Sequence, residues 1–329
     1  MQDDQGWRPS ATHDALAFRA EILARIRAYF TRHNVLEVDT PVMSRAATTD
    51  PAIHSLATTW HGPGTNEGKC FYLHTSPEFP MKRLLAAGSG DIYQLCKVFR
   101  DHERGALHSP EFTLLEWYRN GFDHLDLMDD VERLLTDVLP DKALSHAVSH
   151  WTYRDLFREY AGLAPFAATS EDVAAVLVRH ALDVPVGMDG MPLDAWLDLL
   201  MTGLIEPRMG RGLVFVTDFP ASQASLARLR SDNPQVAARF EVWLEGIEIA
   251  NGFYELADAA EQRQRFMRDN ERRRHSGLDP VPMDEHLLAA LQAGLPDCAG
   301  VAVGIDRLLM VASDAKSLDA VQSFPVEFA

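Results

Sequence analysis

One segment, VFRDHERGALHSPEFTLLEWY (98–118), most limits what this chain can fold into, because it mixes strand-forming residues with groups that are costly to bury. Its two ends, VF and FTLLEWY, are typical of buried β-strands. Arg100, Glu103, His108, Glu111 and Glu116 lie among them. Since alternate residues of a strand share one face, the segment predicts a strand, a loop and a second strand, with polar groups gathered on one face.

On the second strand, Phe112, Leu114, Glu116 and Tyr118 have the same parity and line one face. The aromatic plane suits a purine, and the carboxylate beside a phenol suits an ammonium group. Arg100 ends the first strand and offers a bidentate fork for phosphate or carboxylate. His108 lies in the loop, within reach of the outer end of a polyphosphate. The alternative for this segment alone is a surface hairpin with solvated charges.

Two shorter segments carry further candidate groups. In GIDR (304–307), Gly304 predicts a tight turn into a helix, whose N-terminus together with Arg307 suits an anion. In HTSPEF (74–79), a turn after a strand can present Glu78 to an amine. Taken alone, the first also fits a helix cap with a surface ion pair, and the second fits an ordinary surface turn.

A hairpin is expected within FEVWLEGIEIANGFYEL (240–256), with its turn at 245–246. In that register Trp243 pairs with Glu248, and Glu241 lies on the same face. Two carboxylates so placed need a cation, and Mg²⁺ with ATP phosphates is the natural one; the alternative is that one or both face solvent. Asn251 and Glu255 have the opposite parity to Glu248, so a bulge or a strand end is needed to bring all four together.

The remaining pattern predicts an α+β fold, in which helices flank a mostly antiparallel sheet. We expect one domain over residues 1–329 with a mostly helical insertion at about 125–212. Arg19 is the polar exception on the apolar face of the first expected helix. Other expected helices lie at 80–88, where a glycine closes the helix, and at 259–274. Expected strands lie at 35–43, 91–100 and 213–220, a strand that runs into a turn is expected at 70–78, and 300–313 is expected to form a strand, a tight turn and a helix.

The composition limits the partners and the compartment. The formal charge of −17 repels nucleic acid at long range, so a phosphate ligand needs a local cluster of cations or a metal. The three cysteines are far apart and form no CxxC pair, which fits a reducing cytoplasm. The N-terminus has no signal-peptide pattern, and no apolar run approaches the length of a membrane span.

Taken in order, these segments resemble the three signature motifs of the class II aminoacyl-tRNA synthetases. The helix at 13–34 followed by VLEVDTPVM is similar to the first motif. Arg100-x-x-Glu103 with His108-x-x-x-Phe112 is similar to the second, and GIDR is similar to the third. HSPEFTLLEWY and EIANGFYELAD resemble the lysine-specific branch. The resemblance spans about residues 14–315.

The resemblance implies ATP and Mg²⁺ as cofactors, with Arg100 and Arg307 as catalytic residues. It implies that Glu116, Tyr118 and Glu255, with Asn251 nearby, bind a terminal ammonium, and that Glu241 and Glu248 hold Mg²⁺. The full implied substrate-binding set is Ser76, Pro77, Glu78, Glu116, Tyr118, Asn251, Glu255 and Ala302. The full implied ATP-binding set is Arg100, His102, Glu103, His108, Ser109, Phe112, Glu248, Ile249, Gly304 and Arg307.

Several departures separate this sequence from the lysyl-tRNA synthetases. No N-terminal anticodon-binding domain fits before the first motif. GVAVGIDR has Ala302 in place of the middle glycine of the usual third motif, and FPASQASLARL (219–229) lacks the usual SPLA form. Ser109 stands where asparagine is common.

With these departures, the sequence resembles the truncated lysyl-synthetase paralogues. That family activates (R)-β-lysine, or lysine, and transfers it to a lysine ε-amine of elongation factor P. A cytoplasmic homodimer is then expected, with tRNA an unlikely partner. The alternatives are a tRNA-charging or free amino-acid ligase, an inactive synthetase-like binding module, and an amidating ligase such as one that makes asparagine.

Overall fold

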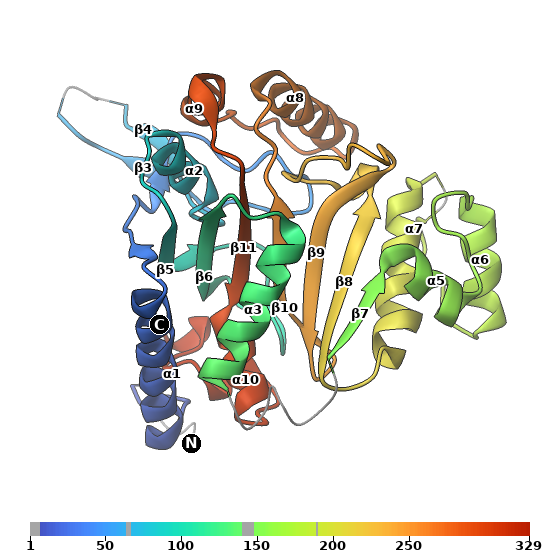
Figure 1. Cartoon of the computed structure of the whole chain (residues 1–329), viewed down its shortest axis with the longest axis horizontal. Coiled ribbons are helices and arrows are strands. Elements are labelled where there is room, and N and C mark those ends of the chain that lie inside the picture. Colours follow the sequence, from blue (N-terminus) through green and yellow to red (C-terminus); the bar gives the residue numbers. More distant parts are fainter. Residues whose placement is uncertain (1–6, 64–66, 140–147, 189) are drawn as a thin grey trace. The chain divides into compact units, whose positions relative to one another are not determined.

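The computed structural model describes residues 7–63, 67–139, 148–188 and 190–329, and it shows the predicted α+β fold with mostly antiparallel strand pairing (Figure 1). The chain divides into two compact units, one formed by residues up to 123 together with 255–329, the other by 124–254. None of the described helices is long and apolar enough to cross a membrane. Residues 1–6, on which part of the signal-peptide argument rests, lie outside the described part.

In the first unit, four strands are hydrogen-bonded in the order β1-β5-β6-β11. As predicted, the segment 98–118 forms a strand, a loop and a strand. The pairs β5–β6 and β6–β11 are antiparallel, and the short β1 is parallel to β5. The strands are β1 (Leu36–Glu37), β5 (Ile92–Phe99), β6 (Glu111–Asn120) and β11 (Cys298–Gly304).

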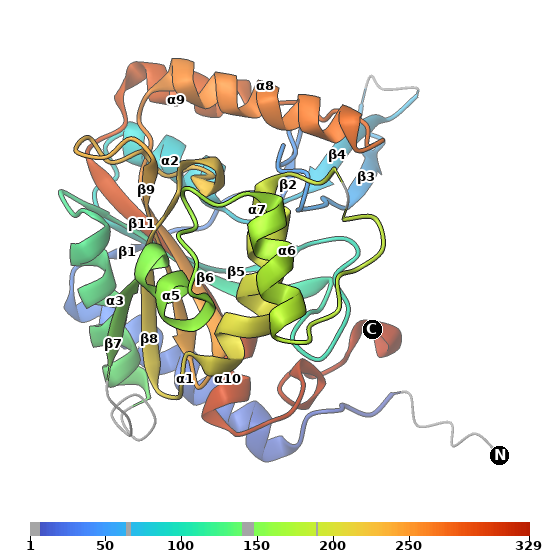
Figure 2. The ribbon, with the colours of Figure 1, turned by 90° about the vertical axis from the view of Figure 1, so that its right-hand side faces the viewer.

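The described residues of this unit also form a smaller antiparallel sheet and five α-helices. Figures 1 and 2 both show α2, α8 and α9 grouped together, and α9 packs against both of the others. The small sheet has the order β2-β4-β3, formed by β2 (Met43–Ser44), β3 (Ala57–Trp60) and β4 (Lys69–Leu73). The helices are α1 (His13–Arg32), α2 (Glu78–Ala86), α8 (Ala259–His275), α9 (Glu285–Gly294) and α10 (Ile305–Ala312).

Three local predictions need correction. The expected strand at 35–43 is wrong in extent, because only β1 and the start of β2 are extended and paired; Pro41, which cannot donate to a strand ladder, lies in the gap. The helix expected at 80–88 is wrong in extent, because α2 spans Glu78–Ala86; its predicted closure by a glycine is confirmed, since Gly88 follows the C-cap Ala87 and takes the positive φ of 87°. Gly304 precedes α10 with an ordinary φ of −73°, so the turn does not require glycine's conformational freedom.

The second unit contains strands in the order β10-β9-β8-β7, of which only β7–β8 is a parallel pair. The expected hairpin and the expected strand at 213–220 are both present. The strands are β7 (Ser149–Thr152), β8 (Leu213–Pro220), β9 (Val236–Leu244) and β10 (Ile247–Tyr254). The α-helices are α3 (His124–Val138), α5 (Tyr153–Ala161), α6 (Ser170–Arg179) and α7 (Leu193–Leu200), and a π-turn at Met201–Ile205 follows α7.

The expected helical stretch builds an apolar core of its own. In Figure 1, α5, α6 and α7 lie on the same side of β7 and β8. Phe157, Leu177 and Leu197 from these helices are buried in one cluster with Val216 and Trp243 from the strands. Residues 140–147 and 189 of this stretch lie outside the described part. That the stretch is an insertion into one domain stays a prediction.

A buried ion pair explains the polar residue on the apolar face of α1. Arg19 Nη1 lies 2.6 Å from Oδ1 of Asp306, whose side chain is only 2% exposed. Arg19 Nη2 donates to Thr113 Oγ1 at 2.6 Å, and the Thr113 backbone N–H donates to Asp306 Oδ2 at 2.6 Å. Arg19 and Asp306 thereby connect α1, β6 and α10, directly before Arg307.

Replacing Arg19 with methionine should lower the free energy of unfolding by about 3–5 kcal/mol, because Asp306 would remain buried without its cation. Urea denaturation measures the change. The matched control is Arg25→Met on the same helix, whose exposed pair with Glu21 should contribute less than about 1 kcal/mol. Equal losses in the two variants would contradict the assigned role of the buried pair.

Candidate active site

Strand β6 presents the predicted carboxylate and phenol on one face. Tyr118 Oη donates to Glu116 Oε1 at 2.6 Å, and Ser76 Oγ donates to Glu116 Oε2 at 2.7 Å. Ser76 Oγ also accepts the backbone N–H of Glu78 at 3.0 Å, while Pro77 precedes the first residue of α2. The Ser-Pro-Glu turn therefore begins α2 and orients Glu116 at the same time.

The sequence interpretation missed Lys82, which lies between two of the predicted carboxylates. Its Nζ is 2.6 Å from Glu78 Oε1 and 2.6 Å from Glu255 Oε2. The side chains of Lys82 and Glu255 are each 1% exposed, and that of Glu78 is 14% exposed. Helical spacing was the available signal, because residues i and i+4 on a helix are neighbours.

Burial is the largest influence on the pKa values of these buried side chains. It raises the pKa of Glu116 to about 7; the charge of Glu78 adds to the shift, and hydrogen bonds from Tyr118 and Ser76 oppose it. Burial also raises the pKa of Glu255 to about 8, and the ammonium of Lys82 is the main opposing influence. Burial by itself lowers the pKa of Lys82, but the charges of Glu255 and Glu78 outweigh it and raise that pKa.

Small residues of β11 lie opposite this face of β6. In the antiparallel register Gly300 pairs with Tyr118, and Ala302 pairs with Glu116. A Cβ at Gly300 would come within 2.3 Å of the Tyr118 ring and 2.5 Å of Glu255 Oε1. Gly300, which the sequence interpretation also missed, is thus the residue that lets these two side chains approach the backbone. Ala302 places its methyl on the same face as Glu116.

The other end of β6 carries the predicted phosphate-binding groups. The Arg100 guanidinium lies over the Phe112 ring, 5.1 Å from its centroid, and Arg100 Nη1 is 3.7 Å from Glu103 Oε1. Arg307 Nη2 lies 2.9 Å from His108 Nε2, and Arg307 Nε donates to the Leu107 carbonyl at 3.1 Å. The loop between β5 and β6 and the first turn of α10 therefore bring the cations of the second and third motifs to the same unit.

The remaining predicted ATP-binding residues of this unit differ in exposure. His102 is exposed and has a positive φ of 64°. Ser109 is buried, which limits direct contact with a ligand. Gly304 is half-buried and pairs with Leu114 at the start of α10.

In the second unit, the predicted hairpin brings three of the candidate residues to one face. Glu248 pairs with Trp243, as predicted, and a bulge follows at Ile249, so that Asn251 pairs directly with Glu241. The parity conflict is therefore resolved by a bulge for Asn251. Arg239 donates hydrogen bonds to both Glu241 and Asn251.

The carboxylates of this hairpin fit a metal ion that is also bound by water and substrate phosphates better than one bound by protein side chains alone. Burial raises the pKa of Glu241 to about 8; Arg239 opposes the shift, and the charge of Glu248 adds to it. Among the described residues, no group of three or more His, Cys, Asp or Glu side chains is placed to hold a metal alone. Mg²⁺ commonly takes one or two carboxylates and completes its shell with waters and substrate phosphates, so Glu241 and Glu248 fit it.

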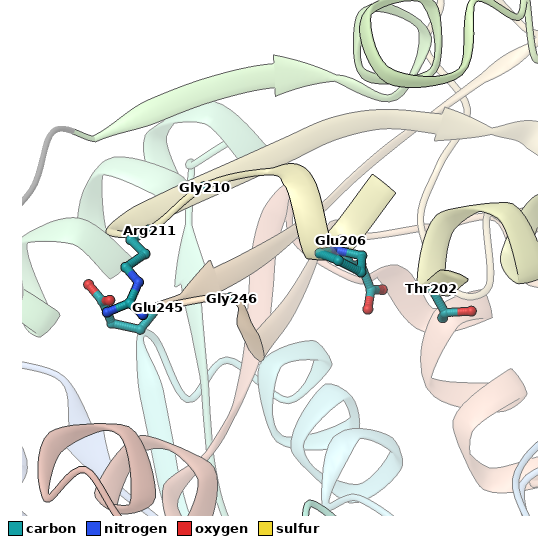
Figure 3. A pocket seen from close by; sticks show the side chains of 7 residues that line it. Thr202, Glu206, Gly210, Arg211, Glu245 and Gly246 are labelled. Carbon is teal, nitrogen blue, oxygen red and sulfur yellow. The ribbon is translucent and has the colours of Figure 1, made fainter. Parts of the chain in front are cut away.

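A separate hollow of about 330 Å³ lies in the second unit, between the turn after α7 and the β9–β10 turn (Figure 3). Arg211 and Glu245 lie beside each other at one end of it, and Glu206 and Thr202 lie further along. None of the predicted site residues is among the seven that line it.

The chain belongs to the family of class II tRNA synthetases (D, K and N), whose family model matches residues 6–327. Curated relatives named elongation factor P (R)-β-lysine ligase are similar over nearly the whole chain. The relative from Vibrio atlanticus is 48% identical over 320 residues, which are 97% of this chain and 98% of the relative. The relative from Photobacterium profundum is 47% identical over 327 residues, 99% of both chains.

Substitution of Glu116 tests the electrostatics of the site. Because its pKa is raised from 4.5 to about 7, the carboxyl stabilises the fold most below the unfolded value and loses that contribution as the pH rises through about 7. The free energy of unfolding of the wild type minus that of Glu116→Gln should therefore fall between pH 4.5 and about pH 7. Urea denaturation across this range measures it, with Glu111→Gln, on the same strand, as the exposed control. A difference that rises with pH would contradict the assignment.

Proposed function

We propose that this protein is an ATP-dependent, AMP-forming ligase that activates (R)-β-lysine, or lysine, and transfers it to a lysine ε-amine of elongation factor P. The observation that carries the proposal is the division of one strand face. Arg100 and Phe112 lie towards one end of β6, and Glu116 with Tyr118 lies towards the other. The first end suits a nucleotide, and the second suits the ammonium of a lysine-type substrate.

In the first step, a carboxylate oxygen of the substrate attacks the α-phosphorus of ATP, the bond to the β-phosphate oxygen breaks, and pyrophosphate leaves. No protein nucleophile is needed. Arg100 would hold the α-phosphate and the substrate carboxylate, and Arg307 with His108 would hold the outer phosphates. These cations act by position and by neutralising charge. Mg²⁺, for which Glu241 and Glu248 are the proposed ligands, supplies further charge neutralisation when bound.

In the second step, the neutral ε-amine of the acceptor lysine attacks the carbonyl carbon of the adenylate. An amide bond forms, the bond from carbon to phosphate oxygen breaks, and AMP leaves. The attacking nitrogen releases its extra proton to solvent. The names of the relatives favour a protein acceptor over tRNA, and the net charge of −17 repels nucleic acid in the same sense.

We also propose that the protein acts in the cytoplasm, because ATP and the proposed acceptor are cytoplasmic. The proposal further includes a homodimer. Large apolar side chains follow α1 on the surface of the first unit: Leu36 is 57% exposed and Met43 is 47% exposed, with Val42 beside Met43. A contiguous apolar patch commonly marks a protein–protein interface, and a second copy of this chain is the proposed partner of these side chains.

Ala302 provides a test of substrate choice. Its methyl lies on the face of Glu116, so Ala302→Gly should change the ratio of kcat/KM for β-lysine to that for α-lysine by about 10-fold or more. ATP–pyrophosphate exchange with each isomer measures the ratio. Ala299→Gly is the matched control, because Ala299 is on the same strand with the opposite parity. The substrate assignment fails if α-lysine is the better substrate of the wild type and the ratio is the same in both variants.

The acceptor has its own test. Incubation of the protein with ATP, β-lysine and elongation factor P should add one β-lysyl group to one lysine of the factor, as measured by intact-protein and peptide mass spectrometry. A parallel reaction with lysine tRNA should give no aminoacyl product. Exchange activity without transfer to the factor would overturn the acceptor while leaving the activation step in place, and charging of tRNA would favour the synthetase alternative.

A further inference from the structure

Lys82 is a buried cation that the proposed reaction does not yet use. It lies on α2, the helix that begins with the Ser-Pro-Glu turn, and its ammonium contacts Glu78 and Glu255 at 2.6 Å each. A lysine that is 1% exposed is uncommon, and it persists only where carboxylates compensate the cost of burial. These two partners are both proposed substrate ligands, so Lys82 contacts the proposed substrate-binding residues directly.

The two carboxyl oxygens of Glu255 have different surroundings. Oε2 lies against Lys82, whereas Oε1 lies close to the Gly300 backbone on the side of the Tyr118 ring. The backbone N–H of Glu255 donates to the Cys298 carbonyl at 3.1 Å, which fixes the residue to β11. The ammonium of Lys82 thus sets the rotation of the carboxyl plane, and with it the direction of the second oxygen.

We infer that Lys82 is a positioning residue, whose buried ammonium holds the Glu78 and Glu255 carboxylates in the orientation that binds an ammonium group of the substrate. This inference rests on the proposed function. Fully ionised, Glu78, Glu116, Glu255 and Lys82 sum to a charge of −2. That sum matches the two ammonium groups of a lysine or β-lysine substrate. Lys82 therefore also sets how much positive charge these residues accept.

The groups that face Lys82 come from several elements. Glu78 is on α2 itself, Glu116 is on β6, where Tyr118 donates a hydrogen bond to it, and Glu255 follows β10 in the sequence. Strand β11 contributes Gly300, which has no charge, and α9 packs against α2 with buried leucines. The charge of Lys82 lowers the pKa of both Glu116 and Glu255, which burial raises. Its loss would therefore make both carboxyls harder to ionise.

The test compares Lys82→Met and Lys82→Arg by ATP–pyrophosphate exchange across pH. In Lys82→Met, the acidic limb of kcat/KM for β-lysine should move to higher pH by about one unit, and KM should rise more than 10-fold with a smaller change in kcat. In Lys82→Arg, the limb should stay near its wild-type pH because the charge is kept. KM should still rise several-fold, because a planar guanidinium cannot hold the two carboxylates as an ammonium does.

The matched control is Arg265→Met, which removes a buried cation that pairs with Glu261 four residues before it on α8. It should lower the melting temperature without moving the pH limb. A Lys82→Met enzyme that loses stability but keeps the wild-type limb and KM would show a merely structural lysine and overturn the inference. If Lys82→Met does not fold, an unchanged KM in Lys82→Arg overturns it. Failure of the wild type to exchange counts against the proposed function instead, so the two failures are distinguishable.

Discussion

The pairing of β6 with β5 on one edge and β11 on the other holds the site of the first unit in place. Both pairs are antiparallel, and their registers set Phe112 opposite Val98 and Ala302 opposite Glu116. A slip of one residue in the β6–β11 ladder would turn Glu116 and Tyr118 away from the small residues of β11. The buried pair of Arg19 and Asp306 secures the end of this arrangement, because Asp306 accepts the backbone N–H of Thr113 on β6.

The paired strands β5, β6 and β11 hold buried charged groups next to hydrogen-bond and ion-pair partners, which lowers the free-energy cost of their burial. Each oxygen of Glu116 accepts a hydrogen bond, one from Tyr118 and one from Ser76, and Glu255 shares the ammonium of Lys82 with Glu78. The raised pKa values of Glu116 and Glu255 show that the compensation is incomplete. A positively charged substrate would complete it, so the same residues that weaken the unliganded fold favour binding.

Much of this arrangement could be predicted from the sequence because it depends on local periodicity. Alternation along β6 was enough to group Glu116 with Tyr118, and the expected 245–246 turn set Trp243 opposite Glu248. The paired extent of 35–43 was overestimated, since strand propensity does not reveal whether a neighbouring strand is present. The bulge at Ile249, which places Asn251 opposite Glu241, could be named as a requirement but not located.

By itself, the sequence determined the α+β class, the strand-loop-strand segment and the family, because these follow from patterns within short windows and from motif order. Only the tertiary structure decided the roles of Arg19, Lys82 and Gly300. Arg19 meets a carboxylate 287 positions away, and Lys82 meets Glu255 across separate elements. The partner of a buried charge is set by packing between distant segments, and neither residue spacing nor propensity carries that information.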